Sequence, residues 1–384
     1  MGIRRVVFDS LRVWQKLFGA KPVGDFLLLS GNEMDTEARL NWYLVDPNRP
    51  IYSHPAAVRH EIAGLAPEFL TPHPRRTVEQ PPGRGHKVLS ASLLPSVAAV
   101  LRDPAGVTLV SPSLYGSADS VGYLRVRSAF APSTPTESTW PLMHLGGSSA
   151  CWAVLAATGP SADGFDYSSC RQADLRIICN SAVRDEALLA AMHPNIVCFG
   201  DPVFHFGPSE YASAFRADLA RACAVLPDLV AVVPEHFREL LLTHLPQLRR
   251  RVYGLTLASV PRGIPDRRQS AATRRTGNVL TQHLLPVALQ FSPKRLSLIG
   301  CDGRKRSERY FWSHGKAVQY SDHLMNSVFE AHPSFFRDVS YANYYKRHCD
   351  ELEGWVRLAE SQGASVDTLT PSFIPVLKTR LVPA

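Results

Sequence analysis

The sequence of 384 residues lacks most of the motifs by which nucleotide-binding and hydrolytic enzymes are recognised. It has no D-x-D, through which many nucleotide-sugar transferases hold a divalent cation, and no G-x-x-x-x-G-K-[ST] phosphate loop. A G-x-S-x-G elbow and a cysteine–histidine set with zinc spacing are also absent, which argues against a hydrolase of that type and against structural zinc. The G-R-G-H-K-V segment at Gly83 follows no predicted strand, so a dinucleotide-binding fingerprint is not supported.

Two further absences concern the compartment in which the chain works. No run of about 18 apolar residues is present, and the N-terminus lacks the charged start, apolar middle and cleavage site of a signal peptide. The seven cysteines form no C-x-x-C pair and several lie in apolar runs, which is typical of buried thiols in a reducing compartment. We therefore expect a cytoplasmic protein that does not span a membrane.

The charge of the chain favours an anionic partner. Lysine and arginine number 42 against 34 aspartate and glutamate residues, which gives a formal net charge of +8. These basic residues are spread along the chain, so nucleic acid, anionic lipid and a nucleotide-sugar are all compatible with the charge alone. Residues 3–18 carry apolar side chains at helical spacing among basic ones, which fits a helix on a membrane surface or a first helix packed on its own domain.

The composition along the chain indicates two parts. Residues 131–141 concentrate proline, serine and threonine, which disfavours regular structure and marks a linker or domain edge. We place a boundary near Ser138, between an accessory region over 1–137 and a larger domain over 138–384. The first part contains strand-like pieces at 26–30 and 107–111 and carries little functional signal.

The second part alternates short apolar runs with helical stretches. Such alternation predicts an α/β fold with a Rossmann-like, mostly parallel sheet and flanking helices. The predicted strands are residues 152–157, 175–179, 196–199, 229–233, 252–255, 295–299 and 365–369. The main predicted helices are residues 211–225, 279–290 and 344–361.

Polar residues and glycines follow several of these strands. In open α/β sheets ligands bind beyond the carboxyl ends of strands, where glycine lets backbone N–H groups approach a phosphate or ribose. A separate R-R-T-G-N segment opens the helix that begins at Val279, where unpaired N–H groups suit either an anion or simple N-capping. The segments after the strands are Thr158-Gly159-Pro160-Ser161, Asn180, Gly200-Asp201-Pro202 and Gly300-Cys301-Asp302-Gly303.

The order of these segments resembles glycosyltransferase family 42, a family of bacterial sialyltransferases. The resemblance rests on T-G-P-S with Asp166 and Tyr167 shortly after it, strands that end in C-N, D-P and I-G-C-D, R-x-T-G-N at a helix start, and a histidine before the last helix and strand. It covers roughly residues 152–369 and is piecewise rather than a long identity.

The resemblance implies a sialyltransferase-type GT-A variant of the Rossmann-like fold that binds a CMP-sugar and needs no metal or other cofactor. It implies that His348 is the general base and that Arg275 stabilises the departing phosphate, with the N–H groups of the T-G-N turn and Tyr310 or Trp312 assisting. The predicted nucleotide-sugar site comprises Thr158, Gly159, Pro160, Ser161, Asn180, Asp201, Thr276, Gly277, Asn278, Asp302 and Tyr310.

Some positions depart from the family pattern. The family usually has asparagine where Thr158 stands, asparagine where Asp201 stands and serine where Gly277 stands. An ionised aspartate donates no hydrogen bond, so it makes different contacts from an amide, and the donor sugar stays open between sialic acid, Kdo and a related nonulosonate. His314 and His332 lie in the same region as His348 and are alternatives for the base.

The resulting hypothesis is an inverting, metal-independent transferase of lipopolysaccharide or capsule biosynthesis. Its acceptor would be a cell-surface glycan or glycolipid, reached by peripheral association with the anionic cytoplasmic face of the inner membrane, and no nucleic acid is involved. Two alternatives remain open. One is a metal-dependent phosphoryl or pyrophosphoryl transferase, which requires a second acidic residue near Asp302, and the other is a non-catalytic nucleotide-binding protein in polysaccharide assembly.

Overall fold

A computed structural model of the chain describes five short N-terminal strands and most residues from Ala150 onward. The described ranges are 26–29, 51–53, 75–77, 87–90, 107–109, 150–201, 204–207, 209–258, 261–264, 272–304, 315–320, 322–331 and 341–382. The amphipathic stripe over residues 3–18 lies outside these ranges. The seven cysteines all carry free thiols.

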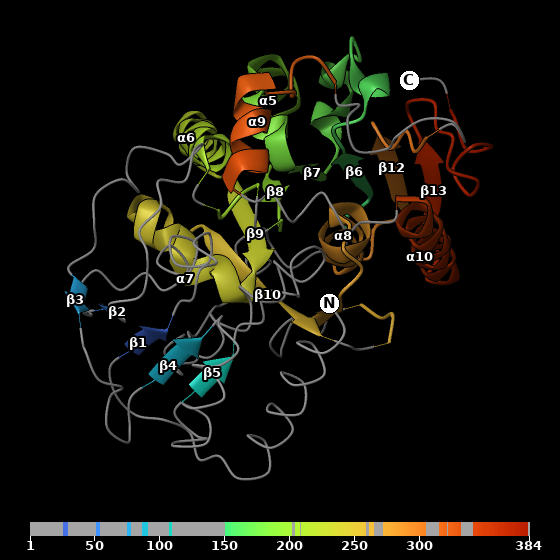
Figure 1. Cartoon of the computed structure of the whole chain (residues 1–384). Coiled ribbons are helices and arrows are strands. Elements are labelled where there is room, and N and C mark those ends of the chain that lie inside the picture. Colours follow the sequence, from blue (N-terminus) through green and yellow to red (C-terminus); the bar gives the residue numbers. More distant parts are fainter. Residues whose placement is uncertain are drawn as a thin grey trace. The chain divides into compact units, whose positions relative to one another are not determined.

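The C-terminal part is built on an eight-stranded sheet whose neighbouring strands are all parallel (Figure 1). This confirms the predicted α/β class. The strand order is β11-β10-β9-β8-β7-β6-β12-β13. The strands are β6 (Trp152–Ala156), β7 (Leu175–Cys179), β8 (Ile196–Cys198), β9 (Val230–Pro234), β10 (Val252–Ala258), β11 (Ala272–Arg274), β12 (Arg295–Ile299) and β13 (Ser365–Thr368).

Seven of these strands coincide with predicted strands, because parallel strands buried on both faces are mostly apolar. The exception is β11, whose three residues Ala272–Arg274 include an exposed arginine and give no apolar signal. Its position beside β10 is fixed by pairing from Thr256↔Ala272 to Ala258↔Arg274.

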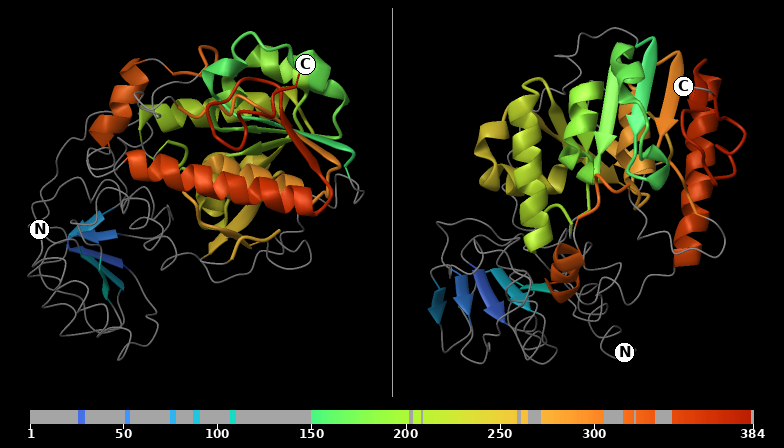
Figure 2. Two further views of the ribbon diagram at one scale, coloured as in Figure 1. Left: turned by 90° about the vertical axis from the view of Figure 1, so that its right-hand side faces the viewer. Right: turned by 90° about the horizontal axis from the view of Figure 1, so that it is seen from above.

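Helices and short turns connect the strands and cover the sheet. A π-helical turn η8 (Leu280–Leu284) continues into α8 (Leu285–Leu289), and all ten residues are buried. This segment and α10 (Tyr341–Ser361) share one apolar core with alternate residues of the strands, with Trp355 fully buried at its centre (Figure 2). The other helices are η4 (Pro160–Ala162), η5 (Tyr167–Gln172), η6 (Asn180–Arg184), α5 (Glu186–Met192), α6 (Glu210–Val225), α7 (Glu235–His244), η7 (Pro246–Leu248) and α9 (Asp322–Ala331).

The N-terminal part contains a second sheet of five parallel strands in the order β3-β2-β1-β4-β5. Two of them, β1 (Phe26–Leu29) and β5 (Val107–Leu109), match predicted strand-like pieces. The others are β2 (Ile51–Ser53), β3 (Arg75–Thr77) and β4 (Lys87–Ser90). This order, in which the chain starts at a central strand and winds outward to both sides, is that of doubly wound nucleotide-binding folds.

The contacts divide the chain into two compact units, neither of which is a continuous stretch. One comprises Met1–Ser133, Pro202–Ser213 and Asp322–Val339, and the other Thr134–Asp201, Ala214–Ser321 and Ser340–Ala384. The second unit holds the eight-stranded sheet and every described residue of the predicted site. Among the described residues, no helix is both long and apolar enough to cross a membrane.

Candidate functional site

The strand order places the reversal of the sheet between β6 and β12. From β6 the chain winds outward through β7 to β11 on one side, and then returns to add β12 and β13 on the other. Ligands of doubly wound folds bind at this switch point, beyond the carboxyl ends of the two strands. The T-G-P-S segment follows β6 and the G-C-D segment follows β12, so the topology brings the two together there.

Backbone contacts join these two segments closely. The Gly159 N–H donates to the carbonyl oxygen of Gly300 at 3.0 Å. Gly300 has a φ of +65°, which glycine adopts without strain, and a Cβ there would lie 2.6 Å from the Ala157 carbonyl oxygen. Glycine at 159 and at 300 is therefore required by close backbone approach.

Asp302 binds the T-G-P-S segment through both oxygens of its carboxylate. Oδ1 accepts the Ser161 backbone N–H at 2.9 Å, and Oδ2 accepts the Ser161 hydroxyl at 2.8 Å. Burial raises the pKa of Asp302 above its ordinary value, although the hydrogen bonds from Ser161 act in the opposite direction. Asp302 thus fixes the shape of the loop rather than presenting two unoccupied oxygens to a ligand.

Residues after β13 also bind the two loops, which no sequence pattern predicted. The Thr370 hydroxyl oxygen accepts the Gly300 N–H at 2.8 Å and lies 2.9 Å from Oγ of Ser161, whose single proton is shared between Asp302 and Thr370. Ser372 donates to the Cys301 carbonyl oxygen at 2.6 Å. The two switch-point loops are therefore held from a third strand end, next to the half-exposed ring of Phe373.

Asn180 follows β7, the strand beside β6, and has a left-handed backbone with φ of 49°. Its side-chain oxygen Oδ1 is buried and has no hydrogen-bond partner among the described residues. A buried polar atom without a partner costs free energy, so this oxygen is suited to accept a hydrogen bond from a ligand at the strand end.

The R-T-G-N turn differs from the expected anion seat. The N–H groups of Thr276 and Gly277 both donate to the side-chain oxygen of Gln282, each at 3.1 Å. Asn278 caps the following turn, with its Oδ1 accepting the Leu280 N–H at 2.9 Å. These groups are engaged within the protein, whereas the Arg275 side chain is exposed and donates to the Leu257 carbonyl oxygen at 3.4 Å.

Tyr344, at the start of α10, joins this turn to the sheet edge. Its hydroxyl donates to the Gly277 carbonyl oxygen at 2.9 Å and accepts from the Asn278 amide at 3.3 Å. Burial raises the pKa of Tyr344 to about 12, and the charge of Asp201 contributes in the same direction. The start of α10 therefore contacts the turn that follows β11.

The predicted base His348 lies on the inner side of α10 and is 4% exposed. Burial lowers its pKa to about 4, so the imidazole is neutral and basic enough to accept a proton only in acid. Its role as base stays a prediction. The competing His314 and His332, and the phosphate contact Tyr310, lie outside the described residues, as does Trp312.

His283 was missed at the sequence level, because a histidine in an apolar helix gives no distinct signal. It is fully buried in η8, and neither ring nitrogen has a hydrogen-bond partner among the described residues. Burial lowers its pKa to about 3. A Cβ at Gly200 would lie 2.6 Å from the ring carbon Cε1, so the ring packs directly below the end of β8.

The carboxylates near the switch point bear on metal binding. The charge of Asp163 adds to the raised pKa of Asp302, after the larger effect of burial. Asp163 itself accepts the Lys316 N–H, with Oδ1 at 2.9 Å. Within the part of the chain that is described, no three histidine, cysteine or acidic residues are grouped to hold a metal ion.

Comparison with known proteins adds a fold-level similarity only. No family model matches the chain. No curated protein sequence matches it either. Two solved structures of the sialyltransferase CstII from Campylobacter jejuni are similar, one with the substrate analogue CMP-3FNeuAc and one with cytidine-5′-monophosphate. Each is 13% identical to this chain, and each alignment covers 60% of this chain and 88% of the CstII chain. The TM-scores are 0.31 and 0.30. At this identity and TM-score the similarity assigns no function.

Proposed function

We propose that this chain is an inverting, metal-independent glycosyltransferase that transfers an acidic sugar, such as sialic acid, Kdo or a related nonulosonate, from a CMP-sugar to a cell-surface glycan or glycolipid. The observation that carries the proposal is the pair of hydrogen bonds from Ser161 to the Asp302 carboxylate at the switch point. These bonds hold the T-G-P-S and G-C-D segments, which both belong to the family-42-like order, in one fixed geometry at the position where such sheets bind nucleotides.

The residues around the Ser161–Asp302 contact offer binding partners for the nucleotide, the phosphate and the sugar carboxylate of a CMP-sugar. The turn Gly159 to Ser161 and the unpartnered oxygen of Asn180 border the nucleotide position, and Asn180 supplies an acceptor for a ribose hydroxyl or a base N–H. The exposed Arg275 side chain supplies positive charge for the phosphate or the sugar carboxylate. Because Gln282 occupies the Thr276 and Gly277 amides, we assign this contact chiefly to the arginine side chain.

The chemistry follows from the donor. The anomeric carbon of a 2-keto acidic sugar bonded to CMP carries a good phosphate leaving group, so the protein must stabilise departing negative charge and accept the proton of the acceptor hydroxyl. Displacement from the opposite face inverts the anomeric centre. Association with an anionic membrane surface stays a prediction that anionic vesicles at low salt would test.

We expect CMP to raise the thermal stability of the purified protein in the presence of EDTA, because a ligand that binds only the folded state stabilises it by mass action. Thermal-shift titrations with CMP, UDP, GDP and ATP, each with magnesium or EDTA, measure this. Arg275→Ala should weaken the CMP shift. A shift with ATP that needs magnesium would favour the phosphoryl-transfer alternative. That alternative requires a second acidic residue near Asp302, and Asp163 is the candidate because its charge adds to the raised pKa of Asp302. No shift with any nucleotide would favour a non-catalytic protein.

The identity of the base should be visible in the pH dependence of transfer. A base must be neutral to act, so activity is lost as the pH falls through its pKa. If His348 is the base, its pKa of about 4 predicts a kcat that is nearly flat from pH 8 to pH 5, and His348→Ala should abolish transfer while CMP affinity persists. A loss of activity centred near pH 6.5, with full activity in His348→Ala and none in His314→Ala, would assign the base to His314.

A further inference from the structure

Two side chains of α10 hold the R-T-G-N turn from one side. Tyr344 and Glu351 are seven residues apart, which is close to two helical turns, so they lie on the same face of α10. Tyr344 binds the Gly277 carbonyl oxygen, and Glu351 binds Arg274, the last residue of β11, with Oε1 to Nη2 at 3.2 Å. The segment from Arg274 to Gly277 is therefore attached to α10 at both ends.

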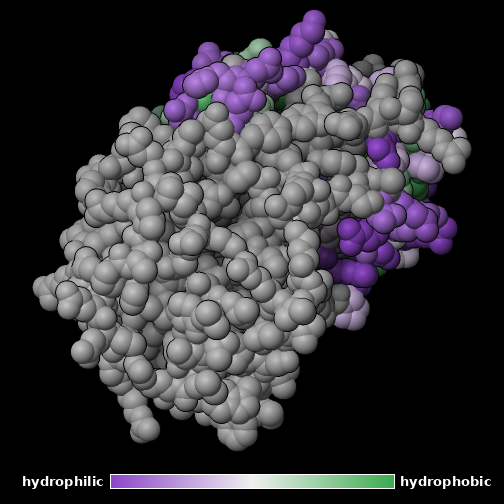
Figure 3. All heavy atoms as spheres, viewed as in Figure 1, coloured by the Kyte–Doolittle hydropathy of each residue, from purple (hydrophilic) through white to green (hydrophobic). Residues whose placement is uncertain are grey.

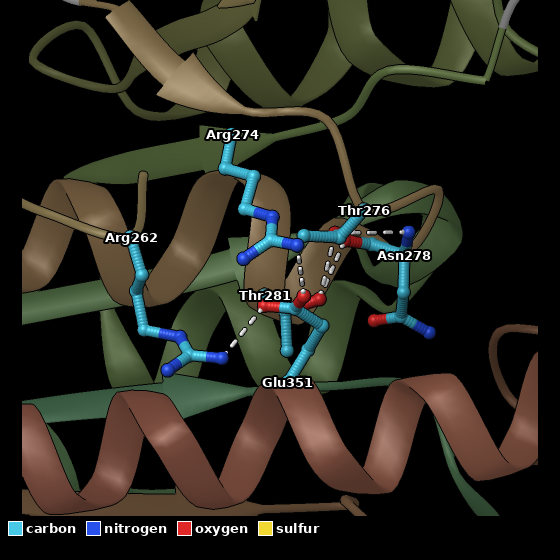
Figure 4. A network of polar contacts seen from close by, with 6 residues as sticks. All are labelled: Arg262, Arg274, Thr276, Asn278, Thr281 and Glu351. Carbon is cyan, nitrogen blue, oxygen red and sulfur yellow. Dashed lines mark hydrogen bonds and ion pairs between the residues drawn. The ribbon is translucent and has the colours of Figure 1, made fainter. Parts of the chain in front are cut away.

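Glu351 also binds a second arginine. Its Oε2 lies 3.1 Å from Nη2 of Arg262, so one carboxylate, 16% exposed, pairs with two guanidinium groups from separate segments (Figure 4). Figure 4 shows both arginines directed toward Glu351, beside the hydrogen-bonded Thr276 and Asn278.

A glycine in the middle of α10 makes room for this arrangement. A Cβ at Gly354 would lie 2.0 Å from the guanidinium carbon of Arg262, so Arg262 rests directly on the helix backbone. Glycine inside a helix costs about 1 kcal/mol relative to alanine, and the close approach of Arg262 gives that cost a structural reason. Hydrophilic residues gather at the right of the molecule in Figure 3.

We propose that Glu351 is a positioning residue of the anion-binding turn: by holding Arg274 it fixes the strand end from which Arg275 extends toward the nucleotide-sugar. The ligand in this statement rests on the proposed function, whereas the hold on the turn does not. Glu351 acts through Arg274 and β11 and itself touches no reacting atom.

The sign of the effect separates positioning from simple electrostatics. Glu351 is a negative charge beside a basic turn, so its neutralisation alone would strengthen the binding of an anion such as CMP. If Glu351 positions the turn, its neutralisation weakens that binding, because Arg274 and the residues after it lose their attachment to α10.

The test is CMP titration of Glu351→Gln by calorimetry, with Glu353→Gln as a matched control. Glu353 lies on the same helix and pairs with Arg357. We expect Glu351→Gln to bind CMP about three- to thirtyfold more weakly, with a Tm within about 3 °C of the wild type, and Glu353→Gln to change Kd by less than about twofold. A Kd for Glu351→Gln equal to or lower than that of the wild type overturns the proposal.

Two further measurements keep the outcome specific. In the double variant with Arg274→Met, the losses should not add, because both act through one contact; additive losses contradict the assignment. Hydrogen exchange of the Thr276 and Gly277 amides, bonded to Gln282, should be faster in Glu351→Gln. If the wild type fails to bind CMP, the proposed function fails, and unchanged exchange at these amides then also overturns the positioning role.

Discussion

Replacing Gly159 with alanine should abolish CMP binding and lower the free energy of unfolding. The added Cβ would lie 2.0 Å from Oδ2 of Asp302 and 2.4 Å from the Gly300 carbonyl oxygen. The carboxylate can rotate away, but the backbone oxygen cannot, so the two switch-point loops must separate. Separation breaks the hydrogen bond from Gly159 to Gly300 and the hydrogen bonds from Ser161 to Asp302. Overpacking of this kind lowers the free energy of unfolding by about 1–3 kcal/mol.

Gly263→Ala is the matched control for this change. A Cβ at Gly263 meets no atom of the described residues within 4 Å, so the substitution adds the same methyl group without a clash among them. Urea unfolding gives the stability of each variant, and calorimetry with CMP gives its affinity. Full CMP affinity in Gly159→Ala would show that the nucleotide does not lie against the switch-point loops, and the proposed site would be wrong.

The sheet itself was largely predictable from the sequence. Seven strands stand out because strands covered on both faces are mostly apolar, and polar residues mark where each strand ends. The strand ends after β6 and β12 were both expected to carry ligand contacts, and the observed order places them side by side. Short strands with charged residues, such as β11, escape this reasoning, since pairing to a neighbour and not their own composition defines them.

The supports of the candidate site could not be predicted, because they come from distant segments. Thr370 reaches Ser161 across 209 positions of the chain, and Tyr344 reaches Gly277 across 67. Single threonines and tyrosines are common, and only the fold shows which of them meet a loop. The T-G-N amides illustrate the same limit: a helix start predicts unpaired N–H groups, but the glutamine that satisfies them is visible only in three dimensions.

Acid should destabilise this protein well above the pH at which its carboxylates titrate, because it contains buried histidines that fold in the neutral form. His283 has a pKa of about 3 in the folded chain against about 6.5 when unfolded. A pKa depressed in this way means that the unfolded state binds the proton more readily, so the full stability is present above about pH 6.5 and falls as the pH drops toward 3. His348, with a pKa of about 4, contributes in the same direction.

Within this window each such histidine should steepen the loss of stability by up to about 1.4 kcal/mol per pH unit. Urea unfolding at pH 7, 6 and 5 measures the slope. His283→Leu should reduce the slope by the contribution of one histidine while retaining the apolar contacts of the ring. An unchanged slope in His283→Leu would show that the His283 imidazole takes up a proton in the folded state, and the expectation drawn from its burial against Gly200 would be wrong.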